Sequence, residues 1–163
     1  MRKRIKQISE NFHFLFHFLL GMSVYYMFYP TVPNKSALFA ACFLATFLPD
    51  LDHFLYYYLY GRKTEYSKIV KDFLRTKQFK NWAKFCKSNH KNFSGLITHN
   101  ILTPAISLFL YSFLLDKGRI VSASFFLAFA LHFVFDMFED LLFFGKLNKN
   151  WFLKFNKTYI TKR

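Results

Sequence analysis

Ten ionisable side chains lie within or at the ends of long apolar segments, where a charge is costly. One charged group at the middle of a membrane-spanning helix costs roughly 2.5–3.5 kcal/mol. Five of the nine acidic residues and five of the six histidines are placed in this way, which chance does not explain. The set consists of His13, His17, Asp50, Asp52, His53, His99, His132, Asp136, Glu139 and Asp140. A mixture of imidazoles and carboxylates is typical of a divalent metal site, with Zn²⁺ or Mn²⁺ the best match.

The spacing of these residues favours a shared site. His13 and His17 are four residues apart, as are His132 and Asp136, and residues with this spacing share one face of a helix. Pro49 is followed by the cluster Asp-Leu-Asp-His. A metal ion neutralises such carboxylates and orients such imidazoles at once, so we predict that these groups meet around metal.

Each residue also has an interpretation without metal. Asp50 follows a proline and could cap the helix that begins after it. His13, His17 and His90 could lie at the headgroup level or in solvent. Glu139 and Asp140, near the end of their segment, are expected to pair with Lys146 or Lys149. These interpretations do not account for the combination of Asp50, Asp52 and His53 with His99, His132 and Asp136.

Four apolar segments carry these residues, at 11–29, 36–60, 94–115 and 120–144. The first, third and fourth are each close to the ~20 residues that a helix needs to cross a bilayer, whereas Pro49 interrupts the second after thirteen residues. Pro49 lacks an amide proton and should push Leu48 out of helical geometry, which predicts a break or kink near residues 48–50. Hydrophobic residues make up 53% of the chain and aromatic residues 23%. We predict an all-α, single-domain integral membrane bundle of about four transmembrane helices over residues 1–163.

The formal charge of +14 follows the segments. Four basic residues precede residue 7, ten lie between 62 and 91, and six follow residue 145, whereas only three lie in the intervening turns. This is the positive-inside pattern. It predicts a multi-pass protein of the cell (inner) membrane with cytoplasmic N- and C-termini, and with the polar groups of all four segments in the cytoplasmic half. No nucleic-acid partner is expected, because the charge follows the topology and no groove-reading motif is present.

Two basic stretches also carry apolar residues at helical spacing, residues 62–92 and 146–163. They are expected to lie on the membrane as amphipathic segments that bind anionic lipid headgroups. The stretch 62–92 is then a cytoplasmic insertion and 146–163 an interfacial tail. Their apolar residues are Ile69, Val70, Phe73, Leu74, Phe79, Trp82, Phe85 and Cys86, then Leu147, Trp151, Phe152, Phe155 and Tyr159.

The order of these motifs resembles the YdjM-like family of inner-membrane, metal-dependent hydrolases. The resemblance is carried by an N-terminal histidine in an apolar helix, the string LPDLDH at 48–53, Thr98-His99 preceded by His90, and a later His-x-x-x-Asp. It implies that the metal-binding and catalytic set comprises Asp50, Asp52, His53, His90, His99, His132 and Asp136, with His13 or His17 as a further ligand.

The function expected from this set is hydrolysis of an ester or phosphoester in a lipid-like or membrane-proximal substrate at the cytoplasmic leaflet. Asp50 and Asp52 are the candidate catalytic carboxylates, and Asp52 is the first choice as a metal ligand. No Ser-His-Asp arrangement and no phosphate-binding glycine loop competes with this interpretation. The alternative is a non-catalytic membrane protein, either a haem- or ion-binding protein or a degenerate homologue with a structural metal.

Overall fold

The computed structural model describes residues 2–89 and 96–152. Over these ranges the chain consists of helices and turns without a strand, which confirms the predicted all-α class. The elements are α1 (Arg2–Phe28), α2 (Lys35–Phe47), a 3₁₀ turn (Leu48–Asp50), α3 (Leu51–Leu55), a π-helical turn (Tyr56–Tyr60), α4 (Glu65–Arg75), α5 (Phe79–Asn89), α6 (Leu102–Asp116), α7 (Ile120–Phe144) and a second 3₁₀ turn (Lys149–Trp151).

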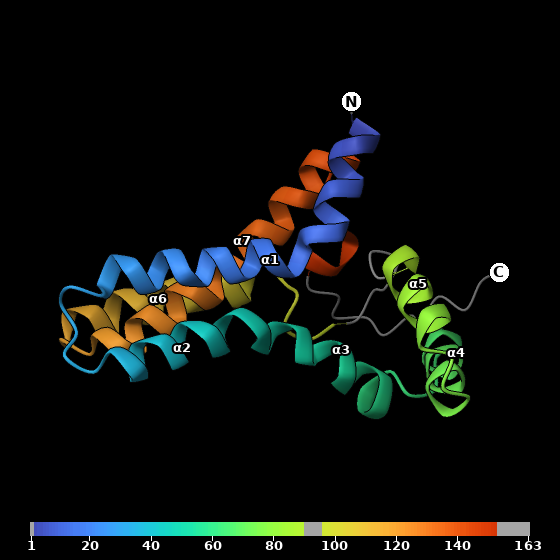
Figure 1. Ribbon diagram of the computed structural model, residues 1–163, viewed down its shortest axis with the longest axis horizontal. Coiled ribbons are helices and arrows are strands. Elements are labelled where there is room, and N and C mark those ends of the chain that lie inside the picture. The colour runs from blue at the N-terminus through green and yellow to red at the C-terminus, as the bar shows by residue number, and fades with distance from the viewer. Residues whose placement is uncertain (1, 90–95, 153–163) are drawn as a thin grey trace.

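Four of the helices, α1, α2, α6 and α7, pack together as a bundle (Figure 1). Helix α7 contacts each of the other three, and α1 also packs against α2. Short turns at 29–34 and 117–119 join α1 to α2 and α6 to α7. Because both turns lie at one end of the bundle, the polar ends of all four segments meet at the other end.

The bundle core near the turns is apolar and closely packed. Leu38 and Ala45 are completely buried, and Ala128 is 2% exposed. At Gly21, a Cβ atom would lie 2.2 Å from Thr46 Oγ1 and 3.1 Å from the carbonyl oxygen of Cys42. Helices α1 and α2 therefore cross so closely that only glycine fits at this position without a shift, as is common at helix crossings in membranes.

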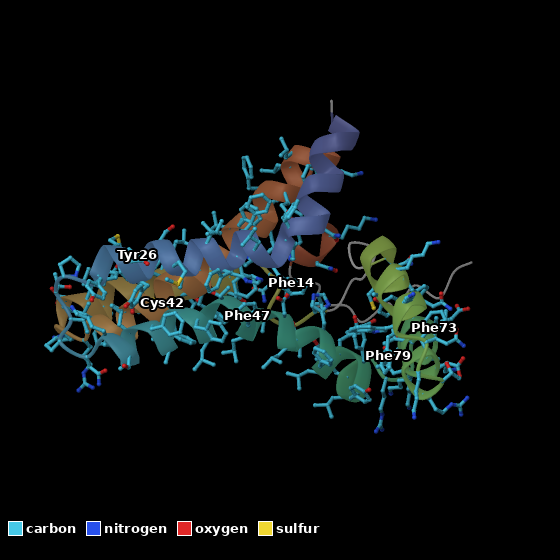
Figure 2. The ribbon with its side chains drawn as sticks, in the orientation of Figure 1. Phe14, Tyr26, Cys42, Phe47, Phe73 and Phe79 are labelled. Carbon is cyan, nitrogen blue, oxygen red and sulfur yellow. The ribbon has the colours of Figure 1, made fainter. Side chains whose placement is uncertain are left out.

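The outer surface of the bundle is strongly apolar. Phe14 is 63% exposed and Tyr26 is 66% exposed, whereas Cys42 lies inside the bundle (Figure 2). Two helical stretches, Lys35–Tyr60 and Ile120–Phe143, are long and apolar enough to cross a membrane, and two shorter apolar helices cover Phe12–Phe28 and Leu102–Asp116. All four predicted apolar segments are thus bundled helices, and two of them reach the length of a full span.

The third apolar segment differs from its prediction, because α6 begins at Leu102 rather than near residue 94. Pro104 lies in the first turn of α6, where its missing amide proton costs nothing. Asn100 sets the start, since its side-chain oxygen accepts hydrogen bonds from the amides of Leu102 (2.9 Å) and Thr103 (3.2 Å). His99 consequently lies in a non-helical segment before α6 and not inside a helix.

The second segment changes its helical geometry at Pro49, as predicted, but it is not broken. Leu48 keeps right-handed helical angles (φ −59°, ψ −38°), contrary to the prediction. The chain tightens into one 3₁₀ turn, resumes as α3, and then widens into a π-helical turn. Asp50 also has helical angles and makes no side-chain capping hydrogen bond, so the capping interpretation of this carboxylate is wrong.

The described part of the basic stretch, residues 62–89, forms the helical hairpin α4–α5, so the predicted amphipathic helices are present. Thr64 caps α4 by accepting the amide of Ser67. The apolar face of α4 packs against the π-helical turn, where Tyr66 and Val70 join Tyr56 and Tyr57 in a second buried cluster. This part of the apolar face is therefore covered by protein rather than lying on the membrane surface as expected.

Candidate metal centre

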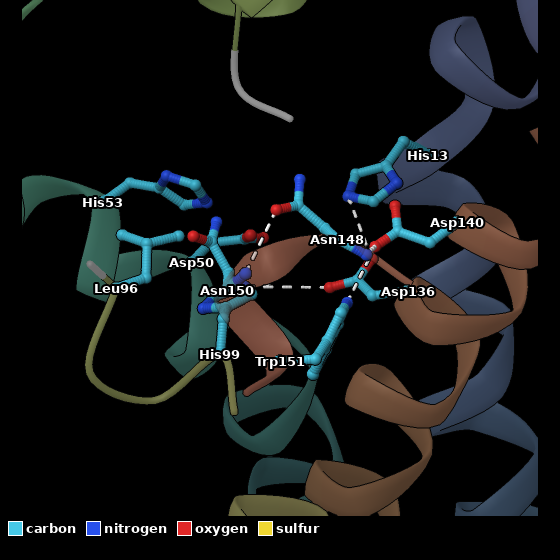
Figure 3. Close-up of a pocket in the computed structure, with 10 residues that line it drawn as sticks. All are labelled: His13, Asp50, His53, Leu96, His99, Asp136, Asp140, Asn148, Asn150 and Trp151. Atoms are coloured by element: carbon cyan, nitrogen blue, oxygen red, sulfur yellow. Dashed lines mark hydrogen bonds and ion pairs between the residues drawn. The ribbon is translucent and has the colours of Figure 1, made fainter. Parts of the chain in front are cut away.

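A pocket of about 430 Å³, its mouth included, lies at the polar end of the bundle (Figure 3). Its lining comes from six separate parts of the fold: α1, the 3₁₀ turn after α2, α3, the segment before α6, the end of α7 and the segment that follows α7. The lining residues are His13, Asp50, His53, Leu96, His99, Asp136, Asp140, Asn148, Asn150 and Trp151.

Asp136 lies at the centre of four histidines. Its Oδ1 atom is 3.4 Å from His17 Nε2 and 4.0 Å from His13 Nε2. Its Oδ2 atom is 3.6 Å from His132 Nε2 and 3.7 Å from His99 Nε2. The two carboxylate oxygens thus face two different pairs of imidazoles. We call His13, His17 and Asp136 the His13 group, and His99, His132 and Asp136 the His99 group.

The proton on His132 is placed by a backbone contact. Its Nδ1 atom lies 2.8 Å from the carbonyl oxygen of Thr46. A carbonyl only accepts, so Nδ1 carries the proton and Nε2 has a lone pair. That Nε2 atom is buried and has no hydrogen-bond partner in the described part of the chain.

The proton on His99 is placed by a chain of three polar groups. The hydroxyl of Thr98 donates its proton to Asp52 Oδ2 at 2.8 Å. The same hydroxyl lies 3.2 Å from His99 Nδ1. Since its proton is already donated to Asp52, the hydroxyl must accept from the imidazole, so Nδ1 of His99 also carries the proton. In the neutral imidazole, Nε2 of His99 then has a lone pair, and this atom lies 3.7 Å from Asp136 Oδ2.

The spacing of the donor atoms in the His99 group agrees better with ligands around a metal ion than with hydrogen bonds among these residues. Two imidazole lone pairs and a carboxylate oxygen meet with no proton between them, and the contacts of 3.6 and 3.7 Å are too long for hydrogen bonds. Around tetrahedral Zn²⁺, with bonds of 2.0–2.1 Å, neighbouring ligand atoms are roughly 3.3–3.4 Å apart. The observed separations are close to that value, so the residues present fit a divalent ion.

Asp52 occupies a different position from the one expected of a metal ligand. Its Oδ2 atom accepts from the amide (2.7 Å) and hydroxyl (2.8 Å) of Thr98, and its Oδ1 atom accepts from the hydroxyl of Tyr60. The nearest imidazole atom is His99 Nδ1, at 3.7 Å from Oδ2. Asp52 is therefore placed to orient His99, as the carboxylate behind a metal-binding histidine does.

Asp50 and His53 lie in the pocket beside these two groups. Asp50 Oδ1 is 4.0 Å from His132 Nε2, and Asp50 Oδ2 is buried without a hydrogen-bond partner among the described residues. The ring of His53 contacts that of His99 edge to face, with centroids 5.3 Å apart. His90, which was also expected in the site, lies outside the described residues.

Glu139 and Asp140 are buried, contrary to the prediction that they pair with lysines at the surface. Glu139 Oε2 lies 3.4 Å from His13 Nδ1. Asp140 Oδ2 accepts from the amide of Asn148 (3.0 Å) and from the indole nitrogen of Trp151 (2.7 Å). Trp151 was expected at the membrane surface and is instead 3% exposed, inside the pocket wall.

Two of the histidines, His17 and His132, lie too close together to hold a haem between their rings. The rings of His17 and His132 stack on each other with centroids 3.8 Å apart and an angle of 19°. A haem held by two histidines needs the imidazoles on opposite faces of the porphyrin. The stacked pair leaves no space for a porphyrin between its rings.

Sequence reasoning missed Tyr60, Asn148 and Asn150 as site residues. Tyr60 lies eight residues after Asp52, about two helical turns, and a phenol at that spacing is the signal that could have found it. No comparable signal marks the two asparagines, because their place in the pocket depends on the chain turning back after α7.

Comparison with known proteins gives one family. The sequence model of the YdjM inner membrane protein matches residues 13–143. This range includes all residues of the His13 and His99 groups and ends just before the segment that follows α7. Searches of curated proteins and of solved structures returned no match.

Proposed function

The chain belongs to the family of YdjM inner membrane proteins, and we propose that it is a membrane-embedded, metal-dependent hydrolase. One observation carries this proposal: the Nε2 atoms of His99 and His132 meet one oxygen of Asp136 at 3.7 and 3.6 Å, without a hydrogen bond between them. Buried acceptors that face one another in this way are stabilised by a cation.

Two divalent ions, Zn²⁺ or Mn²⁺, are proposed, one in each group. His99 and His132 would hold the first and His13 and His17 the second, with one oxygen of Asp136 on each. Such ions, when bound, make a coordinated water acidic near neutral pH and polarise a phosphoryl or acyl oxygen. Both groups draw their ligands from α7 and at least one other part of the fold, so the bundle must be assembled before the ions bind.

The remaining polar residues have distinct roles in this proposal. Asp50 is the candidate general base, because its Oδ2 atom lies at the pocket without a partner within the described ranges. Asp52, Thr98 and Tyr60 fix the orientation of His99. The Thr46 carbonyl does the same for His132.

The proposed substrate is an ester or phosphoester of a lipid-like or membrane-proximal molecule. Around the pocket end, α3 presents Leu51, Phe54 and Leu55 as exposed apolar side chains, which suit contact with acyl chains. Exposed basic residues of the α4–α5 hairpin, such as Lys68 and Lys84, suit anionic headgroups. We propose that this end of the bundle and both termini lie on the cytoplasmic side, which the distribution of basic residues favours.

Metal content and hydrolysis test this proposal together. We expect the detergent-purified protein to hold two ions per chain by elemental analysis, and to hydrolyse a member of a lipid and phosphoester panel. Asp136→Ala should lose both ions and the activity, because each group contains this carboxylate. Asp72→Ala, which removes an exposed carboxylate on α4, is the matched control and should change neither. Equal, low metal content in all three proteins would contradict the proposal.

A further inference from the structure

The segment that follows α7 turns back and forms one wall of the pocket. Gly145 ends α7 in the left-handed conformation (φ 67°), which reverses the chain at that point. Asn148 then opens the second 3₁₀ turn, where its side-chain oxygen accepts the amide of Asn150 at 3.1 Å. Asn148, Asn150 and Trp151 all line the pocket, facing the space that His13 and His53 border (Figure 3). We call residues 145–152 the return segment.

Trp151 fixes the return segment to two parts of the metal centre. Its indole nitrogen donates to Asp140 on α7 at 2.7 Å, and its carbonyl oxygen accepts the amide of Ile101 at 3.0 Å. Its ring also lies 6.1 Å from the ring of His99. The wall is therefore held by hydrogen bonds to both chain segments that flank it and is not a loose tail.

We propose that the return segment selects the substrate by its headgroup, and that Asn150 recognises a headgroup bearing hydroxyls, such as a polyol. This inference rests on the proposed function, because the pocket is the one that holds the metal centre. The return segment lies beyond residues 13–143, the range shared with the family.

The chemistry of the wall indicates a neutral, hydrogen-bonding ligand. The pocket lining within the described residues contains neither lysine nor arginine, and its return-segment side chains are two carboxamides and an indole. A carboxamide both donates and accepts, as a hydroxyl does, and carries no charge. The side-chain oxygen of Asn150 is buried and has no hydrogen-bond partner among the described residues. If the carboxamide turned toward the pocket that Asn150 lines, a hydroxyl of the substrate would donate to this oxygen.

Fluorescence of Trp151 provides a direct binding assay that needs no turnover. The chain has two tryptophans, Trp82 and Trp151. Trp82 lies in α5, packed against the cluster around Tyr66, and its indole nitrogen has no hydrogen-bond partner in the described structure. Trp82→Phe therefore leaves Trp151, next to the pocket, as the single tryptophan, which is excited selectively at wavelengths that the tyrosines do not absorb. Zn²⁺-loaded Trp82→Phe protein is titrated in detergent with glycerol 1-phosphate, phosphocholine and inorganic phosphate.

We expect glycerol 1-phosphate to bind about tenfold more tightly than either of the other two, which corresponds to one well-placed polar contact. Adding Asn150→Ala should remove this preference and leave inorganic phosphate binding unchanged. Asn81→Ala, an exposed asparagine on α5, is the matched control and should retain the preference.

Equal affinities for the three ligands, a preference that survives Asn150→Ala, or no response to any of them would overturn the inference. The proposed function is judged separately, by the metal content of the same preparation. If inorganic phosphate binds only when Zn²⁺ is present, the result supports the proposed metal centre even if headgroup selection is not observed. A protein without metal would instead count against the metal centre itself.

Discussion

The His99 group and the His13 group share Asp136 but are held in different ways. In the His99 group, each imidazole has a partner behind it: the Thr46 carbonyl for His132, and Thr98 with Asp52 for His99. In the His13 group, Nδ1 of His13 faces Glu139 Oε2 at 3.4 Å, but Nδ1 of His17 has no hydrogen-bond partner within the described residues, and the side chain of His13 is 24% exposed.

This difference shows that two sites built from the same residue types can differ in preorganisation. An imidazole whose second nitrogen is anchored has its ring orientation and its proton fixed before metal arrives. The His99 group is therefore expected to bind its ion more tightly, and the His13 group to bind an ion that exchanges more readily. The substitutions below test this difference between the two groups.

The largest effect is expected from His132→Ala. It removes a direct ligand of the anchored site, so metal affinity there should fall by more than about 100-fold, the upper range for loss of a mere supporting partner. Chelator competition followed by elemental analysis should show one ion retained at most. An unchanged two-ion stoichiometry would exclude His132 as a ligand.

A smaller effect is expected from Asp52→Asn, which keeps the shape of the side chain but removes its charge. Affinity of the His99 group should fall about 10- to 100-fold, because the carboxylate behind His99 supports the basicity of the imidazole. The ion of the His13 group should be unaffected. Tyr60→Phe, which removes one of three donors to Asp52, should show the same pattern in weaker form. If Asp52→Asn abolished binding altogether, Asp52 would be a ligand after all.

His13→Ala should have a milder effect still. It is the most exposed member of either group and its Nε2 atom is the farthest from Asp136, at 4.0 Å. We expect the readily exchanging ion to be lost and the tightly bound ion to remain, as measured by elemental analysis before and after dialysis against a weak chelator. Loss of both ions in this variant would show that the two groups form a single site.

The smallest effect on the metal centre, and a direct effect on stability, is expected from Gly21→Ala. The new methyl group meets Thr46 Oγ1 and the Cys42 carbonyl, which should destabilise the protein by about 1–3 kcal/mol as other overpacking changes do. Thermal unfolding in detergent measures the loss. Adding Thr46→Ala removes the closer contact, keeps the Thr46 carbonyl, and should restore part of the stability; no recovery would point to the Cys42 contact instead.

The sequence was sufficient to predict those elements that are marked by a pattern within a short stretch of the chain. Apolar length marked the apolar parts of α1, α2 and α7, and helical spacing marked the pairs that face one another on α1 and α7. Helix α1 nevertheless begins at Arg2, nine residues before the predicted segment, because its basic first turns are helical although they are not apolar. The start of α6 was wrong by eight residues, because apolar composition continues through residues 96–101 while Asn100 and Pro104 determine where helical hydrogen bonding begins.

The site was harder to predict where contacts join distant parts of the chain. Residue type marked His99 and Asp136 as candidate ligands, but it does not separate a ligand from a carboxylate that supports one. The sequence made Asp52 the first choice as a ligand, whereas in the structure its oxygens contact Thr98 and Tyr60. Trp151 and Glu139 look like interfacial residues from sequence. Their burial depends on the return of the chain after α7 and on the approach of α1, which no local pattern records.

Pro49 has no side-chain group that could bind metal, yet it helps to determine which nitrogen of His132 carries the proton. Thr46 is among the last four residues of α2, whose carbonyls have no partner in a regular helix that ends there. Pro49 lacks an amide, and the tighter turn it opens ends the regular hydrogen-bond ladder. The carbonyl of Thr46 is thus left for the imidazole of His132, on another helix. The LPDLDH string therefore contributes to the chemistry twice, through its acidic side chains and through a backbone acceptor that its proline makes available.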